Sequence, residues 1–490
     1  MFLYDLERAD GHALYEKLTG CIRRDILSGR LVAGTRLPSK RQAAAMLGVS
    51  VVTVMGAYEQ LLAEGYILSV KRKGYYVAKL EQRPFAGPDR PVRPPVPSVQ
   101  EKEKPRAAAL PSAGALPDGT DIPSDREVID LVQNNVPPDL FPLSVWNRLS
   151  RRVYAEAGQA LLRRVPYNGL PALRQAIADS LYESRGIVAT PDQILVSAGN
   201  EMLYSTLLSF FGREQVFGVE DPGYRLIARL YRENGASVRY LPLDSQGVMP
   251  QALESSGTTV LHISPAHHFP TGIVTPAGRR QELLAWLEAS PGRYIIEDDY
   301  DSEFRMSGRP IPSLQRLDTT GRVVYINTFT KTVAPSLRIG YAVLPPTLCQ
   351  SYRERFGWLS CPVAVPEQYI LAAFMADGSL SRHINRMRTR CRALRDSLLA
   401  ALNSARQAER YTVSMADGGL HFLLKVDTRL SDADLCRAAA REGIRVLTLG
   451  HYFAVPPAED THTLVINYAG LSEKQASEFA ERLDKILGEE

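Results

Sequence analysis

Residues 328–341, TFTKTVAPSLRIGY, are the stretch from which we infer the fold of most of this 490-residue chain. Thr328 and Thr330 precede Lys331, and Arg338 follows it seven residues later. A lysine that condenses with an aldehyde must be partly deprotonated and held close to the carbonyl carbon. Hydroxyl groups and a guanidinium group are donors that suit a phosphate. The stretch therefore predicts a lysine that forms a Schiff base beside a bound phosphate.

Three upstream stretches carry groups that fit the same chemistry. In IIEDDYDSEF, Asp298 follows an apolar run that predicts a buried strand, and Tyr300 comes two residues later. A carboxylate at a strand end can pair with a protonated pyridine nitrogen. VSAGN predicts a strand, a glycine turn and the start of a helix, whose backbone N–H groups bind anions. VEDPGYR places Tyr224 after a Pro-Gly turn, where its ring is free to stack.

Each of these features has a plainer explanation when it is taken alone. A lysine among threonines is usually a surface residue, EDD is usually a solvated turn, and SAGN is usually a loop. Their occurrence in one order, each at a strand end in an α/β pattern, favours a single site instead.

The region 126–490 alternates helical stretches with short β-rich runs, among them QILVSAG, VFGVED and RYIIEDD. Strands separated by helices predict an α/β lobe with a mostly parallel sheet, extending to about residue 345. Helical patterns dominate afterwards, and a few strands such as TLVINYA follow. They predict a smaller α+β lobe over about residues 346–490.

This region resembles the fold-type I aminotransferases that depend on pyridoxal 5'-phosphate (PLP). The resemblance is carried by YNGLPALR, SAGN, EDPGY, FPTG, EDDYDSEF and TFTKTVAPSLRIG, in that order along the chain. It implies PLP as the cofactor and Lys331 as the residue that forms the Schiff base. It also implies that Asp298 binds the pyridine nitrogen, Tyr300 binds the phenolic oxygen, Tyr224 stacks on the ring, and Arg338, Thr328, Gly199 and Asn200 hold the phosphate.

Two positions depart from the aminotransferase pattern. Many aminotransferases have an asparagine before the PTG turn, where this chain has Phe269. They also bind the substrate α-carboxylate with an arginine in the last strand segment, where LVINYAG places Val465. Arg445, in the preceding GIRVLTL strand, is a candidate substitute for the effector carboxylate. The motifs therefore predict cofactor binding and leave amino-acid turnover open, with residual transamination as one possibility.

The first 80 residues predict three helices and a β-hairpin. Leu14, Leu18, Ile22 and Ile26 lie at four-residue steps, which is the pattern of one helix face. Ser39 and Ser50 can cap two further helices in LPSKRQAAAMLG and VSVVTVMGAYEQLLAEG, and YILSV and YYVA predict two strands around a KRKG turn. Helices joined by a tight turn and followed by a basic hairpin are typical of an α+β winged helix-turn-helix.

The string RLPSKRQAAAMLGVSVVTVMGAYEQLLAEGYI resembles the DNA-binding module of the GntR family of bacterial regulators. The family usually has an arginine where this chain has Val51, so the sequence preference is expected to differ or to depend on the wing. The alternative is a helical module that binds another protein. The resemblance and the basic wing together assign DNA contacts to Ser39, Lys40, Arg41, Ser50, Thr53, Lys71, Arg72, Lys73 and Gly74.

Composition supports this division into parts. The chain is 45% hydrophobic and 23% charged, which is typical of soluble globular proteins. Residues 80–125 carry ten prolines, so residues 81–125 are interpreted as a Pro-rich linker. Residues 1–79 have a net charge of +5, residues 80–125 of −1 and residues 126–490 of 0. The excess positive charge is therefore concentrated in the part that is expected to meet a polyanion.

The cysteines and the apolar runs favour a cytoplasmic protein. The five cysteines are scattered, without a CxxC or a Cys/His cluster, so we expect a reducing compartment, no disulfide framework and no metal site. No apolar run reaches the ~18–20 residues that span a membrane, and we expect no membrane partner.

A GntR-like module, a Pro-rich linker and an aminotransferase-like body, in that order, resemble the MocR subfamily of bacterial transcription regulators. The resemblance implies a homodimer, head-to-tail, that binds promoter DNA and senses a small amino compound, or PLP itself, through its body. Two alternatives stay open. One is an active aminotransferase with an ancillary DNA-binding module, and the other is a metabolic enzyme with a protein-binding module.

Overall fold

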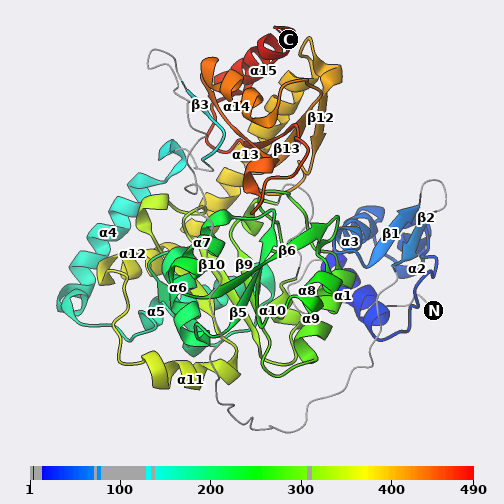
Figure 1. Cartoon of the computed structure of the whole chain (residues 1–490). Coiled ribbons are helices and arrows are strands. Elements are labelled where there is room, and N and C mark those ends of the chain that lie inside the picture. The colour runs from blue at the N-terminus through cyan, green and yellow to red at the C-terminus, as the bar shows by residue number, and fades with distance from the viewer. Residues whose placement is uncertain are drawn as a thin grey trace. The chain divides into compact units, whose positions relative to one another are not determined.

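The computed structural model describes residues 4, 14–70, 74–78, 128–133, 138–305 and 312–489 (Figure 1). The chain divides into two compact units, residues 1–115 with 276–292, and residues 116–275 with 293–490. The proposed linker 81–125 and the wing residues Lys71, Arg72 and Lys73 lie outside the described residues. The expected domain boundaries near residues 80 and 125 therefore stay a prediction.

The first unit contains the helices and the hairpin that the sequence predicts. Its elements are α1 (Leu14–Leu27), α2 (Lys40–Leu47), α3 (Val51–Ala63), β1 (Ile67–Val70), β2 (Gly74–Val77) and, from the second segment, α9 (Ala277–Glu288). The strands β1 and β2 pair antiparallel. Leu18 and Ile22 on α1 are buried against Tyr58 and Leu61 on α3, so the four-residue apolar repeat forms the core of this unit.

Capping residues fix where α2 and α3 begin. The Ser39 side chain accepts a hydrogen bond from the Gln42 backbone N–H, and the Gln42 side chain accepts one from Ser39 in return. Gly48 ends α2 in the left-handed conformation, at φ 63°. Ser50 then caps α3 by accepting from the Thr53 N–H at 3.0 Å. Both N-caps are the serines that the sequence predicts.

The second unit is built on an eight-stranded sheet in the order β4-β11-β10-β9-β8-β5-β6-β7. Its strands are β4 (Ile194–Ser197), β5 (Val216–Asp221), β6 (Ser237–Asp244), β7 (Gly247–Val248), β8 (Val260–Ile263), β9 (Tyr294–Asp299), β10 (Val323–Thr328) and β11 (Gly340–Val343). The five strands β10, β9, β8, β5 and β6 run parallel. The sequence prediction of a mostly parallel sheet is confirmed.

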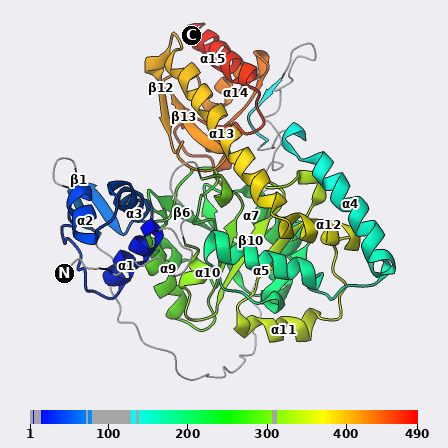
Figure 2. The same ribbon diagram turned by 180° about the vertical axis from the view of Figure 1, so that it is seen from behind.

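Helices cover both faces of this sheet. Neighbouring residues of β10 pack against the helices on opposite faces. Val324 packs in a core with the helices α6 and α7, whereas Tyr325 packs in a core with α5 and α12. The helices of this lobe are α4 (Leu143–Ala157), α5 (Pro171–Arg185), α6 (Asn200–Phe211), α7 (Arg225–Glu233), α8 (Pro250–Ser255), α10 (Leu314–Leu317), α11 (Pro346–Phe356) and α12 (Val365–Ala376). Figures 1 and 2 show α5 and α6 around the same strands. Burial on both faces explains the nearly continuous apolar runs of these strands.

The small lobe has its own core around a four-stranded antiparallel sheet, β12-β13-β16-β15. Its elements are α13 (Ser379–Asn403), β12 (Tyr411–Ser414), β13 (His421–Val426), α14 (Asp432–Arg441), β14 (Ile444–Arg445), β15 (Leu447–Thr448), β16 (Thr463–Asn467), α15 (Glu473–Gly488) and β3 (Ile129–Asp130). The strand β3 pairs with β14, while α11 and α12 still pack on the large sheet. The core of the small lobe therefore draws on α13 and on the segment around β3, and the boundary expected at about residue 346 stays a prediction.

Among the residues that the structure describes, no single helix is both long and apolar enough to cross a membrane. The pair α2 and α3 passes the same test of length and composition only when the two are joined, with a bend of 120° between them.

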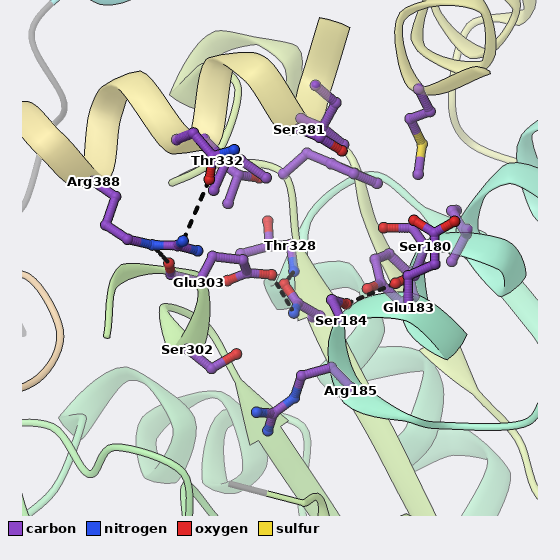
Figure 3. Close-up of a pocket in the computed structure, with 18 residues that line it drawn as sticks. Ser180, Glu183, Ser184, Arg185, Ser302, Glu303, Thr328, Thr332, Ser381 and Arg388 are labelled. Carbon is purple, nitrogen blue, oxygen red and sulfur yellow. Dashed lines mark hydrogen bonds between the residues drawn. The ribbon is translucent and has the colours of Figure 1, made fainter. Parts of the chain in front are cut away.

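A buried ion pair joins α5 to β9. Arg185 Nη2 lies 2.7 Å from Asp299 Oδ2, and the two side chains are 2% and 1% exposed. The Tyr325 and Ser302 hydroxyls donate to the same carboxylate at 2.8 and 2.9 Å. Figure 3 shows Arg185 beside a cavity of about 260 Å³ that Glu303 also lines.

Removal of the Arg185 cation should destabilise the second unit strongly. In Arg185→Met, Asp299 keeps its buried charge and its hydroxyl donors but loses its cation, so we expect the free energy of unfolding to fall by about 3–5 kcal/mol. Urea unfolding measures this loss.

The matched control is Arg390→Ala, which removes a more exposed pair with Glu473. Its cost should stay below about 1 kcal/mol. The double variant Arg185→Met/Asp299→Asn should recover part of the loss. If Arg185→Met and Arg390→Ala lowered the free energy of unfolding by the same amount, that result would contradict a special role of the buried pair.

Candidate functional site

Lys331 lies in the turn that follows β10, at the edge of the sheet where the parallel strands end. The Thr328 and Thr330 hydroxyls are 2.7 Å apart, and the Thr330 backbone N–H donates to Thr328 Oγ1 at 3.1 Å. Burial lowers the pKa of Lys331 to about 8, and the nearby Asp301 carboxylate acts in the opposite direction. With a pKa of about 8, about a tenth of Lys331 is neutral and nucleophilic at pH 7, and about half of it at pH 8.

A glycine and an arginine form an anion-binding arrangement at the start of α6. Gly199 precedes the helix at φ 83°, and a Cβ at this position would lie 2.9 Å from Arg338 Nη2. Only a residue without a side chain lets the guanidinium lie this close to the helix N-terminus. Arg338 itself adopts the left-handed conformation, at φ 49°, and donates to Glu201 at 2.6 Å. The N-terminus and the guanidinium together favour an anion.

Asp298 lies near the end of β9 with a 4% exposed fraction. The Tyr204 hydroxyl donates to Asp298 Oδ2 at 2.5 Å, and the Asn200 amide lies 3.5 Å from Oδ1. His262 Nε2 is 3.4 Å from the same Oδ2 atom. These groups orient the carboxylate that the sequence assigns to a pyridine nitrogen.

The two tyrosines that were expected to contact the cofactor ring differ in their surroundings. Tyr300 is largely enclosed, and its hydroxyl lies 3.4 Å from His267 Nδ1. Burial, together with the Asp301 and Asp298 charges, holds the pKa of Tyr300 well above its usual value. Tyr224, just before α7, is 48% exposed and meets the Phe269 ring edge-on at 6.2 Å. Tyr224 therefore presents an accessible ring.

Val465 and Phe269, the two positions that differ from the aminotransferase pattern, lie in one apolar cluster. Val465 is 1% exposed in a cluster with Leu423, Leu447 and Tyr452, and Phe269 packs against the same cluster. The surroundings of Val465 are therefore apolar where aminotransferases place a guanidinium.

Arg445 lies in β14, and its Nη1 atom is 3.1 Å from Asp130 Oδ2. Its charge is thus matched by a carboxylate of the neighbouring strand β3. The role of Arg445 in effector binding stays a prediction.

Three residues of the site were not predicted from the sequence: Tyr204, His262 and His267. Tyr204 follows Asn200 by four residues on one helix, and this spacing could have placed both on the same face. His262 lies in the fully buried strand β8, where a polar residue is a signal in itself. His267 lies two residues before Phe269, in the HxFPTG turn that this chain shares with the MocR subfamily, and no chemical role follows from that turn alone.

The residues assigned to DNA gather at the starts of α2 and α3, with Gly74 at the start of β2. Ser39, Arg41 and Ser50 are exposed, and Lys40 pairs with Glu59 at 3.6 Å. Thr53 shares a 2.8 Å hydrogen bond with the Ser50 hydroxyl. At the start of α3, Val51 and Val52 are 45% and 69% exposed, so this helix presents apolar side chains where the family usually has an arginine.

Comparison with known families identifies both parts. Residues 126–483 match the family described as aminotransferase class I and II, and residues 14–77 match the bacterial regulatory proteins of the gntR family. The body is also similar in fold to LysN, the alpha-aminoadipate aminotransferase of Thermus thermophilus, in its complex with N-(5'-phosphopyridoxyl)-L-leucine. The TM-score is 0.65 at 24% identity, over 74% of this chain and 92% of LysN.

Relatives are similar over nearly the full length. The uncharacterized HTH-type transcriptional regulator YhdI of Bacillus subtilis is 33% identical, over 96% of this chain and 94% of YhdI. The probable rhizopine catabolism regulatory protein MocR of Rhizobium meliloti is also 33% identical, over 95% of this chain and 91% of MocR. The chain therefore belongs to the MocR-type HTH transcriptional regulators, in which a gntR-family DNA-binding domain precedes a class I and II aminotransferase domain.

Proposed function

We propose that this transcription regulator holds PLP at Lys331 and uses the same site to sense a small amino compound or PLP itself. The observation that carries the proposal is a contrast within one site. The residues assigned to PLP follow strands that end at one edge of the sheet, whereas Val465, at the position assigned to the substrate arginine of aminotransferases, lies in an apolar cluster. A body of this kind can bind the cofactor and respond to it without efficient turnover of amino acids.

The described residues fit PLP at each part of the molecule. Gly199 and Arg338 form a cradle that a Cβ would fill, which suits the phosphate. The Asn200 Oδ1 atom is buried and has no hydrogen-bond partner within the structure. Asp298 suits the pyridine nitrogen, and Lys331 suits the aldehyde. When it is bound, PLP supplies an aldehyde that reacts reversibly with primary amines.

The residues of this chain then have separate tasks in sensing. Lys331 presents an amine that loses its proton more readily than an ordinary lysine, and Arg338 with the α6 N-terminus holds the phosphate in place. Tyr204 and Asn200 orient the Asp298 carboxylate. An effector that binds differently to two arrangements of the protein shifts the balance between them, and this shift is the basis of regulation.

We further propose a head-to-tail homodimer that acts on promoter DNA in the cytoplasm. Two copies of the DNA-binding domain require two half-sites, whose spacing follows from the dimer. The net charge of +5 over residues 1–79 supports attraction to phosphates. Because the body is electrically balanced, DNA affinity should depend on the N-terminal domain alone.

The alternative function is an active aminotransferase with an ancillary DNA-binding module. The lowered pKa of Lys331 also suits that chemistry. The two functions differ in turnover, because a true aminotransferase converts an amino donor and a keto acid repeatedly. Retained PLP absorbance without multiple turnover would favour the regulator.

Capture of PLP should depend on pH with a midpoint of about 8. The pKa of Lys331 is about 8 in the folded chain, against an ordinary value of 10.5. Between these values the unfolded chain binds more protons, so the cost of burying Lys331 is present below pH 8 and is relieved as the pH rises to 10.5. The rate of PLP uptake by the stripped protein, followed by visible absorbance, should therefore rise through pH 8.

Lys331→Ala is the control and should show no covalently held PLP at any pH. A midpoint near 10.5 in the unmodified protein would contradict a buried, partly neutral lysine.

Loss of Lys331 should also uncouple the effector from DNA. With Lys331→Ala, we expect binding to the protein's own upstream DNA to persist in a gel-shift assay while its response to PLP or an amine disappears. A variant that still responds like the unmodified protein would overturn sensing through Lys331. Failure of the unmodified dimer to shift any fragment of that region would overturn the regulatory role.

Arg41→Ala should weaken DNA binding through the loss of a phosphate contact. The plot of log affinity against log salt should become shallower by about 1. The exposed Arg24, on α1 of the same unit, provides the control variant Arg24→Ala, which removes the same charge away from the α2 and α3 starts. Equal salt slopes for Arg41→Ala and the unmodified protein would exclude Arg41 from the interface.

A further inference from the structure

Three buried residues from separate segments meet beside the proposed PLP site. His267 lies in the loop after β8, Asp301 follows β9, and His421 is the first residue of β13. Their exposed fractions are 5%, 1% and 0%. Each can offer one ligand atom such that all three atoms lie within 4.8 Å of one another. We call these residues the His-Asp-His cluster.

Hydrogen bonds inside the protein leave part of this cluster unused. His421 Nε2 lies 3.1 Å from the Pro270 carbonyl oxygen, which can only accept. Nε2 therefore carries the hydrogen, and Nδ1 keeps a lone pair that has no partner within the structure. His267 Nδ1 lies 2.9 and 3.1 Å from the two Asp301 oxygens, and His267 Nε2 is also buried without a partner. A network that served only packing would leave the buried lone pair of His421 Nδ1 unsatisfied.

The spacing of His267 and Asp301 suits a shared metal ion. In a tetrahedral zinc site with ligand bonds of 2.0–2.1 Å, neighbouring ligand atoms are about 3.3 Å apart. For zinc to bind His267 Nδ1, the hydrogen of this ring must move from Nδ1 to Nε2, and the nitrogen-oxygen pair at 2.9–3.1 Å must open by only a few tenths of an ångström. His421 then needs a modest side-chain adjustment, because its ligand atom lies within 4.8 Å of the other two.

We propose that the His-Asp-His cluster binds one Zn²⁺ ion through two imidazole nitrogens and one carboxylate oxygen. Neutral imidazole and carboxylate are ligands that zinc accepts readily, and three protein ligands leave a fourth position open. The proposal does not rest on PLP sensing. The sequence suggested no metal site because the two histidines lie in distant segments of the chain.

The backbone around the cluster is shaped to leave room for it. Gly419, just before β13, adopts φ 66°, and a Cβ at this position would collide with the His267 ring and lie 2.5 Å from Asp301 Oδ2. Glycine is therefore required for the loop to approach these ligands. The Tyr300 hydroxyl, 3.4 Å from His267 Nδ1, connects the cluster to the proposed PLP site.

The test measures zinc directly in the full-length protein without an affinity tag. Protein with bound PLP is stripped with EDTA, incubated with ZnCl₂, desalted and analysed by mass spectrometry of the metal. We expect one zinc per chain, and at least a tenfold weaker affinity in His421→Gln and His267→Gln. Substitution with Co²⁺ should give the intense visible bands of a tetrahedral site.

The matched control is His383→Gln. His383 on α13 is 1% exposed, and neither of its ring nitrogens has a partner, but it lies among the aromatic rings of Phe141 and Phe374 instead of a carboxylate. This variant should retain one zinc per chain. Visible PLP absorbance shows independently that each variant is folded and that the PLP proposal holds.

Two results would overturn the zinc site. One is an unmodified protein that retains no zinc after desalting while it still binds PLP. The other is zinc retention in His421→Gln and His267→Gln equal to that of the unmodified protein.

Discussion

The parallel pairing of β9 with β10 is the constraint on which the candidate site depends. Asp298 lies opposite Ile326 and Asp299 opposite Asn327, so the two strands end at the same edge of the sheet. Because the carboxyl ends of parallel strands meet there, Asp298 and Tyr300 after β9 lie at the same edge of the sheet as Lys331 after β10, although they are separated along the chain. The antiparallel strand β11 then returns from the lysine turn and brings Arg338 to the start of α6, beside Gly199.

Much of this arrangement could be predicted from local patterns. The N-caps Ser39 and Ser50, the mostly parallel sheet and the order of the site motifs are properties of short stretches, which the sequence displays directly. The partners of Asp298 could not be predicted with the same ease. His262 reaches it from a neighbouring strand, and the pairing of strands β8 and β9 is a tertiary fact. The proximity of His267 to His421 also depends on tertiary packing and could not be predicted from short stretches. The same holds for the pairing of β3 with β14, which places Arg445 beside Asp130.

This chain has Val465 at the position assigned to the arginine of aminotransferases, and this difference bears on which ligands the site can distinguish. An arginine at this place would hold a carboxylate by two charge-assisted hydrogen bonds, which give orientation as well as affinity. The apolar cluster around Val465 supplies neither, and a carboxylate placed there would lose solvation without gaining a partner. The chemistry of Lys331 is untouched by this exchange, because its reactivity depends on burial in another part of the site.

A regulator needs less from its ligand than an enzyme needs from its substrate. An enzyme must stabilise a transition state, which demands positioned groups at every reacting atom. A sensor only has to bind its effector differently in two arrangements, and a coupling of about 1–3 kcal/mol already changes the affinity for DNA by about 5–150-fold. A site that keeps a reactive lysine and a phosphate cradle but lacks the carboxylate-binding arginine meets that smaller demand. In the proposed mechanism the positive N-terminal domain supplies the attraction to DNA phosphates, and the shift in the body would act on DNA occupancy through this domain.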